Sequence, residues 1–280
     1  MTVPNLALHD GTSIPQLGFG VFQVPPAETA ATVARALDVG YRHIDTAQMY
    51  GNEEGVGSAI KDSGLARDEL YVTTKLNNSF HRPDDARREI EASLERLGLE
   101  QVDLFLIHWP LPTRYDGDYV ATWRALIEAQ EAGRTRSVGV SNFQPDHLDR
   151  IVEETGVVPV VNQVEVHPFL TNEAVRSANA RHGVLTEAWS PIAKGSVVDD
   201  ETIAGIAAEV GRTPAQVTLR WHVQRGDIVF PKSMSVERMR ENFAIFDFEL
   251  TPDQVAAIAG LDRGEDGRTG PHPDTFDWIP

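Results

Sequence analysis

Short runs of apolar residues alternate with amphipathic segments along the chain. Eight runs are mostly apolar and bounded by polar turns, which is typical of strands buried on both faces of a parallel sheet. They lie at 16–22, 41–45, 70–75, 103–109, 136–142, 160–166, 184–189 and 227–232. Between them, apolar residues recur every three or four positions, which indicates helices. These segments are 28–39, 52–62, 83–97, 118–132, 145–153, 172–182, 201–210, 214–224 and 235–243.

The clearest helix is predicted at 83–97. Pro83 suits the first helical position and Gly98 suits the stop after the last turn. The apolar residues between them share one face: Ala86, Ile90, Leu94 and Leu97. Thr213-Pro214 and Thr251-Pro252 are two further helix starts, because a threonine hydroxyl before the proline can accept a hydrogen bond from a backbone N–H.

Eight strand–helix units in about 250 residues predict a (β/α)8 TIM barrel. Two short apolar patches flank Asp10-Gly11, which predicts an N-terminal β-hairpin that plugs the bottom of the barrel. A doubly wound sheet is disfavoured, because neither Gly-x-Gly sequence, at 18–20 and 55–57, continues into the G-x-G-x-x-G turn of that fold. We expect residues 1–280 to form a single barrel domain with a mobile C-terminal tail.

Composition and charge narrow the possible functions. The chain of 280 residues has no cysteine, which excludes disulfides, thiolate metal sites and a cysteine nucleophile. The 42 acidic and 25 basic residues give a net charge of −17, which argues against nucleic-acid and membrane partners. No apolar run is long enough to span a membrane, and the first residues lack the pattern of a signal peptide. We therefore expect a cytoplasmic monomer.

Polar side chains come at the ends of the predicted strands. In a barrel these ends meet at one mouth, where barrel enzymes carry their active sites. The pattern therefore predicts an enzyme, and its candidate residues are Asp45, Lys75, His108, Ser141, Asn142, Gln163, Trp189, Ser190 and Lys232. No spacing typical of a metal site occurs, and no metal is expected.

Four side chains near these strand ends suggest proton transfer to a carbonyl group. Tyr50 follows Asp45 by five residues and can reach back over the mouth. A phenol has a pKa near 10, and a neighbouring ammonium is expected to lower it. Lys75 provides that ammonium, Asp45 holds it in place, and His108 can donate a hydrogen bond to the carbonyl oxygen. The alternative for the Asp45–Lys75 pair alone is a structural ion pair.

Sequence motifs along nearly the whole chain resemble the aldo-keto reductase family. They are YRHIDTAQMYGNEEGVG (41–57), TTKL (73–76), LFLIHWP (104–110), GVSNF (139–143), VNQVEVHP (161–168) and FPKS…R…EN (230–242). The opening QLGFGVFQVPP and the tail at 270–274 are similar to the prokaryotic branch that includes 2,5-diketo-D-gluconate reductase.

The resemblance implies a catalytic tetrad of Asp45, Tyr50, Lys75 and His108, with Tyr50 as the general acid and NADPH as the hydride donor. Further residues match family positions that bind this cofactor. Ser141, Asn142 and Gln163 match the contacts to the nicotinamide carboxamide, Trp189 matches the aromatic residue that stacks on the ring, and Ser190 begins a loop (190–195) that resembles the one folding over the pyrophosphate.

The resemblance also implies a site for the adenosine end of the cofactor. Lys232, Ser233 and Arg238 match the residues around the 2′-phosphate, which favours NADPH over NADH, and Glu241 and Asn242 match adenine contacts. Two cations and a hydroxyl within seven residues of an acidic protein suit a dianion. Ser235 departs from the family, whose relatives often carry a basic residue there.

Phe22, Trp109 and the C-terminal tail would form the substrate pocket by analogy. Asn77 stands where the family usually has tryptophan, so this wall is smaller and more polar. The expected function is reduction of aldehydes and ketones, with diketo-sugar acids or small dicarbonyls as candidate substrates. Two alternatives stay open: a non-catalytic redox sensor that binds NADPH, and a lyase that uses Lys75 as a Schiff-base nucleophile, which needs a neutral lysine.

Overall fold

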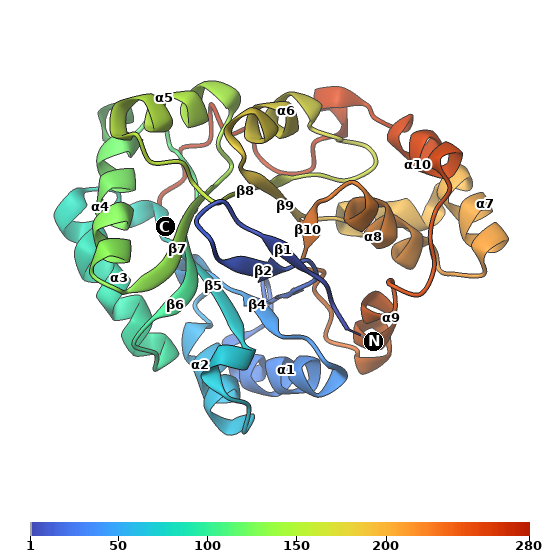
Figure 1. Ribbon diagram of the computed structural model, residues 1–280, viewed down its shortest axis with the longest axis horizontal. Helices are drawn as coiled ribbons and strands as arrows, with labels where there is room; N and C mark the ends of the chain where they lie inside the picture. Colours follow the sequence, from blue (N-terminus) through green and yellow to red (C-terminus); the bar gives the residue numbers. More distant parts are fainter. Residues whose placement is uncertain (1) are drawn as a thin grey trace.

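A computed structural model describes residues 2–280, and its centre is an eight-stranded parallel sheet (Figure 1). The strands pair in chain order: β3 (Phe19–Gly20), β4 (His43–Asp45), β5 (Tyr71–Leu76), β6 (Val102–Ile107), β7 (Thr135–Ser141), β8 (Val161–Glu165), β9 (Leu185–Trp189) and β10 (Ile228–Val229). A parallel bridge between Leu17 and Val229 joins the first strand region to the last. This closure confirms the predicted barrel.

Helices surround the strands and follow them along the chain (Figure 1). They are α1 (Pro26–Val39), α2 (Glu53–Asp62), α3 (Pro83–Leu97), α4 (Tyr119–Glu131), α5 (Pro145–Thr155), α6 (Glu173–His182), α7 (Glu201–Val210), α8 (Pro214–Gln224), α9 (Val236–Phe243) and α10 (Pro252–Ala259). Helix α3 has the predicted bounds, and it ends because Gly98 adopts a left-handed φ of 64° that glycine tolerates. The Thr213 and Thr251 hydroxyls cap α8 and α10 as predicted.

Two strands differ most in length from the prediction. β3 and β10 contain two residues each, whereas apolar runs at 16–22 and 227–232 suggested longer strands. Pro231 has no backbone N–H and cannot extend the β10 ladder. The segment before β3 makes contact with β10 through two hydrogen bonds: Gly18 N donates to Val229 O at 2.8 Å, and Val229 N donates to Gln16 O at 3.1 Å.

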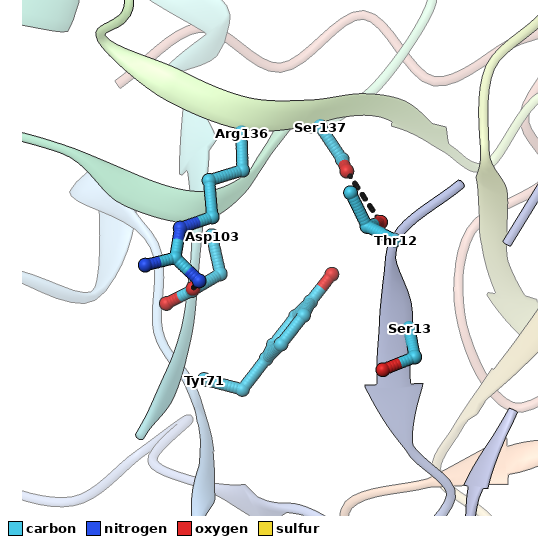
Figure 2. Close-up of a pocket in the computed structure, with 6 residues that line it drawn as sticks. All are labelled: Thr12, Ser13, Tyr71, Asp103, Arg136 and Ser137. Atoms are coloured by element: carbon cyan, nitrogen blue, oxygen red, sulfur yellow. Dashed lines mark hydrogen bonds and ion pairs between the residues drawn. The ribbon is translucent and has the colours of Figure 1, made fainter. Parts of the chain in front are cut away.

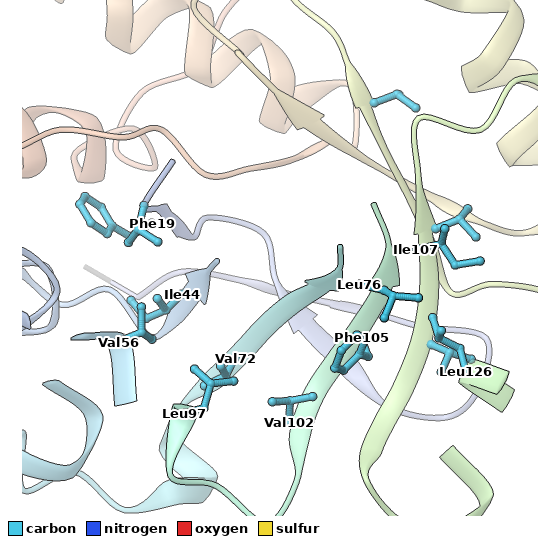
Figure 3. Close-up of a cluster of buried hydrophobic side chains, with 14 of the residues drawn as sticks. Phe19, Ile44, Val56, Val72, Leu76, Leu97, Val102, Phe105, Ile107 and Leu126 are labelled. Carbon is cyan, nitrogen blue, oxygen red and sulfur yellow. The ribbon is translucent and has the colours of Figure 1, made fainter. Parts of the chain in front are cut away.

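The main hydrophobic core lies between the strands and the helices. Figure 3 shows part of it, with Ile44 near Val56 from a helix, Val72 near Leu97 from another helix, and Phe105 further along the sheet. These five side chains are almost completely buried. This layer fixes the helices to the outside of the barrel, so that the strand ends and their loops keep a constant spacing.

The N-terminal hairpin closes the bottom of the barrel as predicted. Its strands, β1 (Asn5–Ala7) and β2 (Ser13–Pro15), are antiparallel, and Leu8 and Ile14 are buried in a cluster with barrel residues that include Leu104 and Ile228. Beside the hairpin lies a cavity of about 310 Å³ (Figure 2). Its lining comes from the hairpin and from the amino-terminal ends of β5, β6 and β7: Thr12, Ser13, Tyr71, Asp103, Arg136 and Ser137.

No helix among residues 2–280 combines the length and the apolar character needed to cross a membrane.

Candidate active site

A buried ion pair lies at the carboxyl ends of β4 and β5. The Lys75 side chain is fully buried, and its ammonium donates to Asp45 Oδ1 at 2.7 Å and to the Thr46 carbonyl oxygen at 2.8 Å. The same ammonium lies 3.5 Å from the hydroxyl of Tyr50, which belongs to the short 3-10 helix Gln48–Tyr50 after β4. The structure therefore brings together the carboxylate, ammonium and phenol that the sequence placed at neighbouring strand ends.

The environment keeps Lys75 charged. Burial acts to lower its pKa, but the contacts with Asp45 and Tyr50 outweigh burial and raise the pKa above the ordinary value. A lysine that stays an ammonium at neutral pH is a poor nucleophile toward a carbonyl carbon. The ion pair therefore suits electrostatic and hydrogen-bonding roles.

The expected effect of Lys75 on the pKa of Tyr50 has to be corrected. The ammonium does act to lower that pKa, but burial of the phenol is the larger effect and, together with Asp45, raises it above 10. The expectation considered the neighbouring charge without the loss of water around the hydroxyl. Tyr50 consequently keeps its proton throughout the neutral range, which is the form that a general acid needs.

His108 lies directly after β6 and faces the same phenol. The two rings are 5.7 Å apart between centroids and meet edge to face. Burial, reinforced by Lys75 and His81, holds the pKa of His108 well below its usual range. The imidazole is therefore neutral at physiological pH and has one N–H donor and one acceptor nitrogen.

Four further predicted residues form a connected layer beside the ion pair. Ser141 Oγ donates to the Gln163 carbonyl oxygen at 2.8 Å, and Asn142 Nδ2 donates to the His108 carbonyl oxygen at 2.9 Å. Asn142 Oδ1 accepts a hydrogen bond from Trp189 Nε1 at 2.8 Å, which fixes the indole at the end of β9. The indole is part-buried, so part of its surface stays open at the mouth.

Gln163 connects this layer to a residue that sequence reasoning missed. Its Nε2 donates to Asp45 Oδ2 at 2.9 Å and to Glu187 Oε2 at 2.8 Å. Glu187 is fully buried in β9, two residues before Trp189. An acidic residue inside an apolar strand was a visible signal in the sequence, but its contact with Gln163 depends on the register of β8 and β9.

A second region, at the start of α9, contains the cations predicted to bind a phosphate. Ser235 caps this helix by accepting from the Arg238 backbone N–H at 3.4 Å. Lys232 and Arg238 are exposed, and within residues 2–280 neither forms a salt bridge. Ser233 is buried beside them, and its hydroxyl donates to the Ser235 carbonyl oxygen at 3.2 Å. Two positive charges without a salt-bridge partner among residues 2–280, together with a helix start, favour an anion at this place.

The other residues predicted near the cofactor lie around these two regions. Glu241 is partly buried, and one of its carboxylate oxygens accepts from the Thr213 hydroxyl at 2.6 Å. Asn242 next to it is buried. Ser190 follows β9 and has a left-handed φ of 52°, which turns the chain sharply after Trp189.

The predicted substrate residues line different sides of the mouth. Phe22 is exposed, with its ring 5.0 Å from that of Tyr50. Trp109 is buried, and Phe276 from the C-terminal tail packs on it at 4.2 Å. Asn77 is partly buried, and its side-chain oxygen already accepts from a backbone N–H in the following turn.

The C-terminal tail is anchored beside this mouth. Asn78 Nδ2 donates to the Trp278 carbonyl oxygen at 3.0 Å, and Arg114 forms a 3.0 Å salt bridge with Asp277. Trp278 itself is half exposed. The tail therefore lies near the mouth as predicted and is held there by these contacts, whereas its mobility stays a prediction.

Barrel enzymes carry their chemistry at the carboxyl ends of the strands, and the polar groups of this chain gather there. A protonated phenol beside a buried ammonium at this end is an arrangement that can donate a proton. The cavity under the hairpin lies at the opposite end and contains none of these groups.

Comparison with known proteins identifies the family. The aldo/keto reductase family matches residues 16–263. The chain is 48% identical over 276 residues to an aldo-keto reductase of Mycolicibacterium smegmatis, with 99% of each chain covered. It is 49% identical over 276 residues to the methylglyoxal reductase DkgA of Yersinia pestis, covering 98% of this chain and 97% of that one.

A solved structure agrees with these relatives. The crystal structure of a Gox0644 mutant in complex with NADPH has a TM-score of 0.94 and 46% identity, with 99% of this chain and 100% of that chain covered. The chain belongs to the aldo/keto reductase family, in the prokaryotic branch that its motifs predicted, and it is an oxidoreductase acting on carbonyl groups.

Proposed function

We propose that this single-domain barrel reduces small aldehydes and ketones to alcohols with NADPH, and that Tyr50 donates the proton. The observation that carries the proposal is the fully buried ammonium of Lys75, 3.5 Å from a phenol at the open end of the barrel. A cytoplasmic location and a monomeric state stay predictions from the sequence.

The residues present fit NADPH. Lys232 and Arg238 are exposed cations without a salt-bridge partner in the described part of the chain, and the Ser233 hydroxyl lies next to Lys232 in sequence, so these residues suit a phosphate monoester. Trp189 is a partly exposed indole, a flat aromatic system that suits stacking with another flat ring. When bound, NADPH supplies the hydride that a carbonyl carbon accepts.

The proton comes from this chain. Tyr50 is protonated at neutral pH because burial raises its pKa, and an oxygen that gains negative charge during reduction becomes a much stronger base than a phenolate. As the proton leaves, the ammonium of Lys75 stabilises the phenolate that forms. Asp45 holds that ammonium in place, and neutral His108 can orient the carbonyl oxygen by donating one hydrogen bond.

The two alternatives make different demands. A Schiff-base lyase needs a neutral lysine, and the raised pKa of Lys75 opposes that. A redox sensor would bind NADPH without reducing a carbonyl. A measurement of carbonyl turnover therefore distinguishes it from a reductase. The candidate substrates are small dicarbonyls and diketo-sugar acids. Relatives named methylglyoxal reductase support the first of these.

The test follows NADPH oxidation across a carbonyl panel that includes methylglyoxal, diketogluconate, aromatic aldehydes and simple sugars. Tyr50→Phe should lower kcat by roughly 10²- to 10⁴-fold, the usual contribution of a general acid, while NADPH still binds. Tyr119→Phe is the matched control, because this tyrosine lies on α4 and contacts Phe143 and Arg150 on the outside of the barrel. Near-normal turnover by Tyr50→Phe would show that another group donates the proton.

A further inference from the structure

Glu187 is a fully buried carboxyl group that the proposed reaction does not use. It lies opposite Gln163 in the register of β9 with β8, and its Oε2 accepts from Gln163 Nε2 at 2.8 Å. Its other oxygen, Oε1, is buried and has no hydrogen-bond partner among residues 2–280. A buried carboxyl group with one unpartnered oxygen is unfavourable for folding. Its position beside the candidate site therefore suggests a functional role.

The contact with Glu187 restricts how the amide of Gln163 can turn. An amide nitrogen has two hydrogens, and here one goes to Glu187 and the other to Asp45 Oδ2 at 2.9 Å. When Glu187 is ionised, rotating the amide by half a turn would direct its oxygen at two acceptor oxygens and lose both bonds. The amide oxygen of Gln163 therefore points away from the acids. It accepts no hydrogen bond from the described residues, and it is not among the buried atoms without a partner.

We propose that Glu187 is a positioning residue, which fixes the amide of Gln163 so that its oxygen can accept a hydrogen bond from the carboxamide N–H of the nicotinamide. The inference rests on the proposed function. Without Glu187, Gln163 keeps one of its two acceptors and its amide can turn, and a turned amide presents N–H groups to a ligand that also offers N–H groups.

The charged groups around Glu187 make this role dependent on pH. Burial, followed by the negative charge of Asp45 on β4, raises the pKa of Glu187 to about 8, whereas Lys75 on β5 acts in the opposite direction. The negative charge of Glu187 also helps to raise the pKa of Tyr71 on β5, which burial raises most. On β8 and β10 the residues in register are Gln163 and Ile228, which do not titrate. Above pH 8 a charged Glu187 should hold the Gln163 amide more firmly, because hydrogen bonds to carboxylates are stronger.

The experiment measures NADPH affinity by quenching of tryptophan fluorescence in the full chain. Glu187→Leu should raise the Kd for NADPH about tenfold, the value of one hydrogen bond. Glu187→Gln, which keeps an acceptor oxygen, should stay within twofold at pH 7. Gln163→Leu and the double variant Gln163→Leu/Glu187→Leu should show equal Kd values, because Glu187 then has no amide left to position.

A cofactor analogue separates positioning from a structural effect. In reduced 3-acetylpyridine adenine dinucleotide phosphate the carboxamide is replaced by an acetyl group without N–H, so Glu187→Leu should not change its Kd. An equal loss with NADPH and with the analogue would overturn the proposal, because it would show general damage to the site. Unchanged NADPH binding by Glu187→Leu would overturn it as well.

The dependence of the Kd for NADPH on pH tests the proposal even if Glu187→Leu does not fold, because it needs only the wild type and Glu187→Gln. Between pH 7 and 9 the wild-type Kd for NADPH should fall as Glu187 ionises, and Glu187→Gln, which has no proton to lose, should stay flat. Parallel profiles for the two proteins would contradict the role of Glu187. Failure of the wild-type chain to bind NADPH or reduce any carbonyl would instead contradict the proposed function, and the inference with it.

Discussion

Each end of the barrel has a buried aspartate, a cation and a tyrosine, but the two sets differ in their access to water. At the mouth, Asp45 pairs with Lys75, whose side chain is 0% exposed. At the bottom, Asp103 pairs with Arg67 and Arg136, whose side chains are 30% and 46% exposed. The bottom charges are therefore screened by solvent, whereas the mouth charge acts at close range in a poorly solvated place.

The tyrosines show what this difference means for chemistry. Burial raises the pKa of both Tyr50 and Tyr71 above the ordinary value. Only Tyr50 has an ammonium 3.5 Å from its hydroxyl, whereas the buried hydroxyl of Tyr71 has no hydrogen-bond partner among the described residues. The same residue types therefore form a solvent-screened ion-pair cluster at the bottom of the barrel and, at the mouth, a protonated phenol beside a buried ammonium, which is the arrangement we propose as the proton donor.

The largest effect is expected for Lys75→Met. The phenolate of Tyr50 loses its stabilising charge, so kcat should fall by on the order of 10³-fold. Asp45 keeps a charge without its cation, and the free energy of unfolding should decrease by about 3 kcal/mol. Steady-state kinetics and urea denaturation measure the two effects. Arg136→Met at the bottom is the control, with kcat unchanged. An equal loss of kcat in both variants would mean that the buried charge at the mouth has no special role in the reaction.

A pH effect on stability comes from His43, which lies beside Tyr71 and the N-terminal hairpin at the bottom of the barrel. Its ring contacts the Thr73 hydroxyl at 3.0 Å, and burial lowers its pKa to about 4, against the opposing effect of Asp45. The unfolded chain binds this proton near pH 6.5, so stability is full above that pH and is lost as the pH falls toward 4. The loss from this group should reach about 3 kcal/mol.

The comparison of wild type with His43→Gln tests this assignment. Urea denaturation between pH 7 and 4 should show a shallower decrease in the free energy of unfolding for the variant, because it has no imidazole to protonate. Identical slopes would mean that other groups cause the acid sensitivity.

Much of the barrel could be predicted from the sequence because its signals are local. Apolar runs and helix periodicity located the strands and helices, and Pro83 and Gly98 marked both ends of α3. The grouping of Asp45, Lys75 and His108 followed from one rule, that parallel strand ends meet. The direction of the pKa shift of Tyr50 and the contact of Glu187 with Gln163 could not be predicted, because both depend on burial and strand register.

A smaller effect is expected at the exposed cations of the mouth. Replacing Lys232 and Arg238 by methionine together removes the positive charges proposed to meet the 2′-phosphate, so the Kd for NADPH should rise roughly tenfold or more. The Kd for NADH, which lacks that phosphate, should stay within twofold. Isothermal titration calorimetry with NADPH and with NADH measures both Kd values. Equal losses for the two cofactors would place these cations elsewhere along the dinucleotide.

The smallest effect is expected for Asp103→Asn at the bottom. The asparagine oxygen can still accept from the Val72 backbone N–H, which Asp103 binds at 2.9 Å, but the salt bridges to Arg67 and Arg136 lose their charge. Because both arginines reach solvent, unfolding should become easier by only about 1 kcal/mol. Activity should not change, since no mouth residue contacts Asp103. A tenfold fall in kcat/KM would mean that the bottom of the barrel controls the geometry of the mouth, and the contrast between scaffold and site would no longer hold.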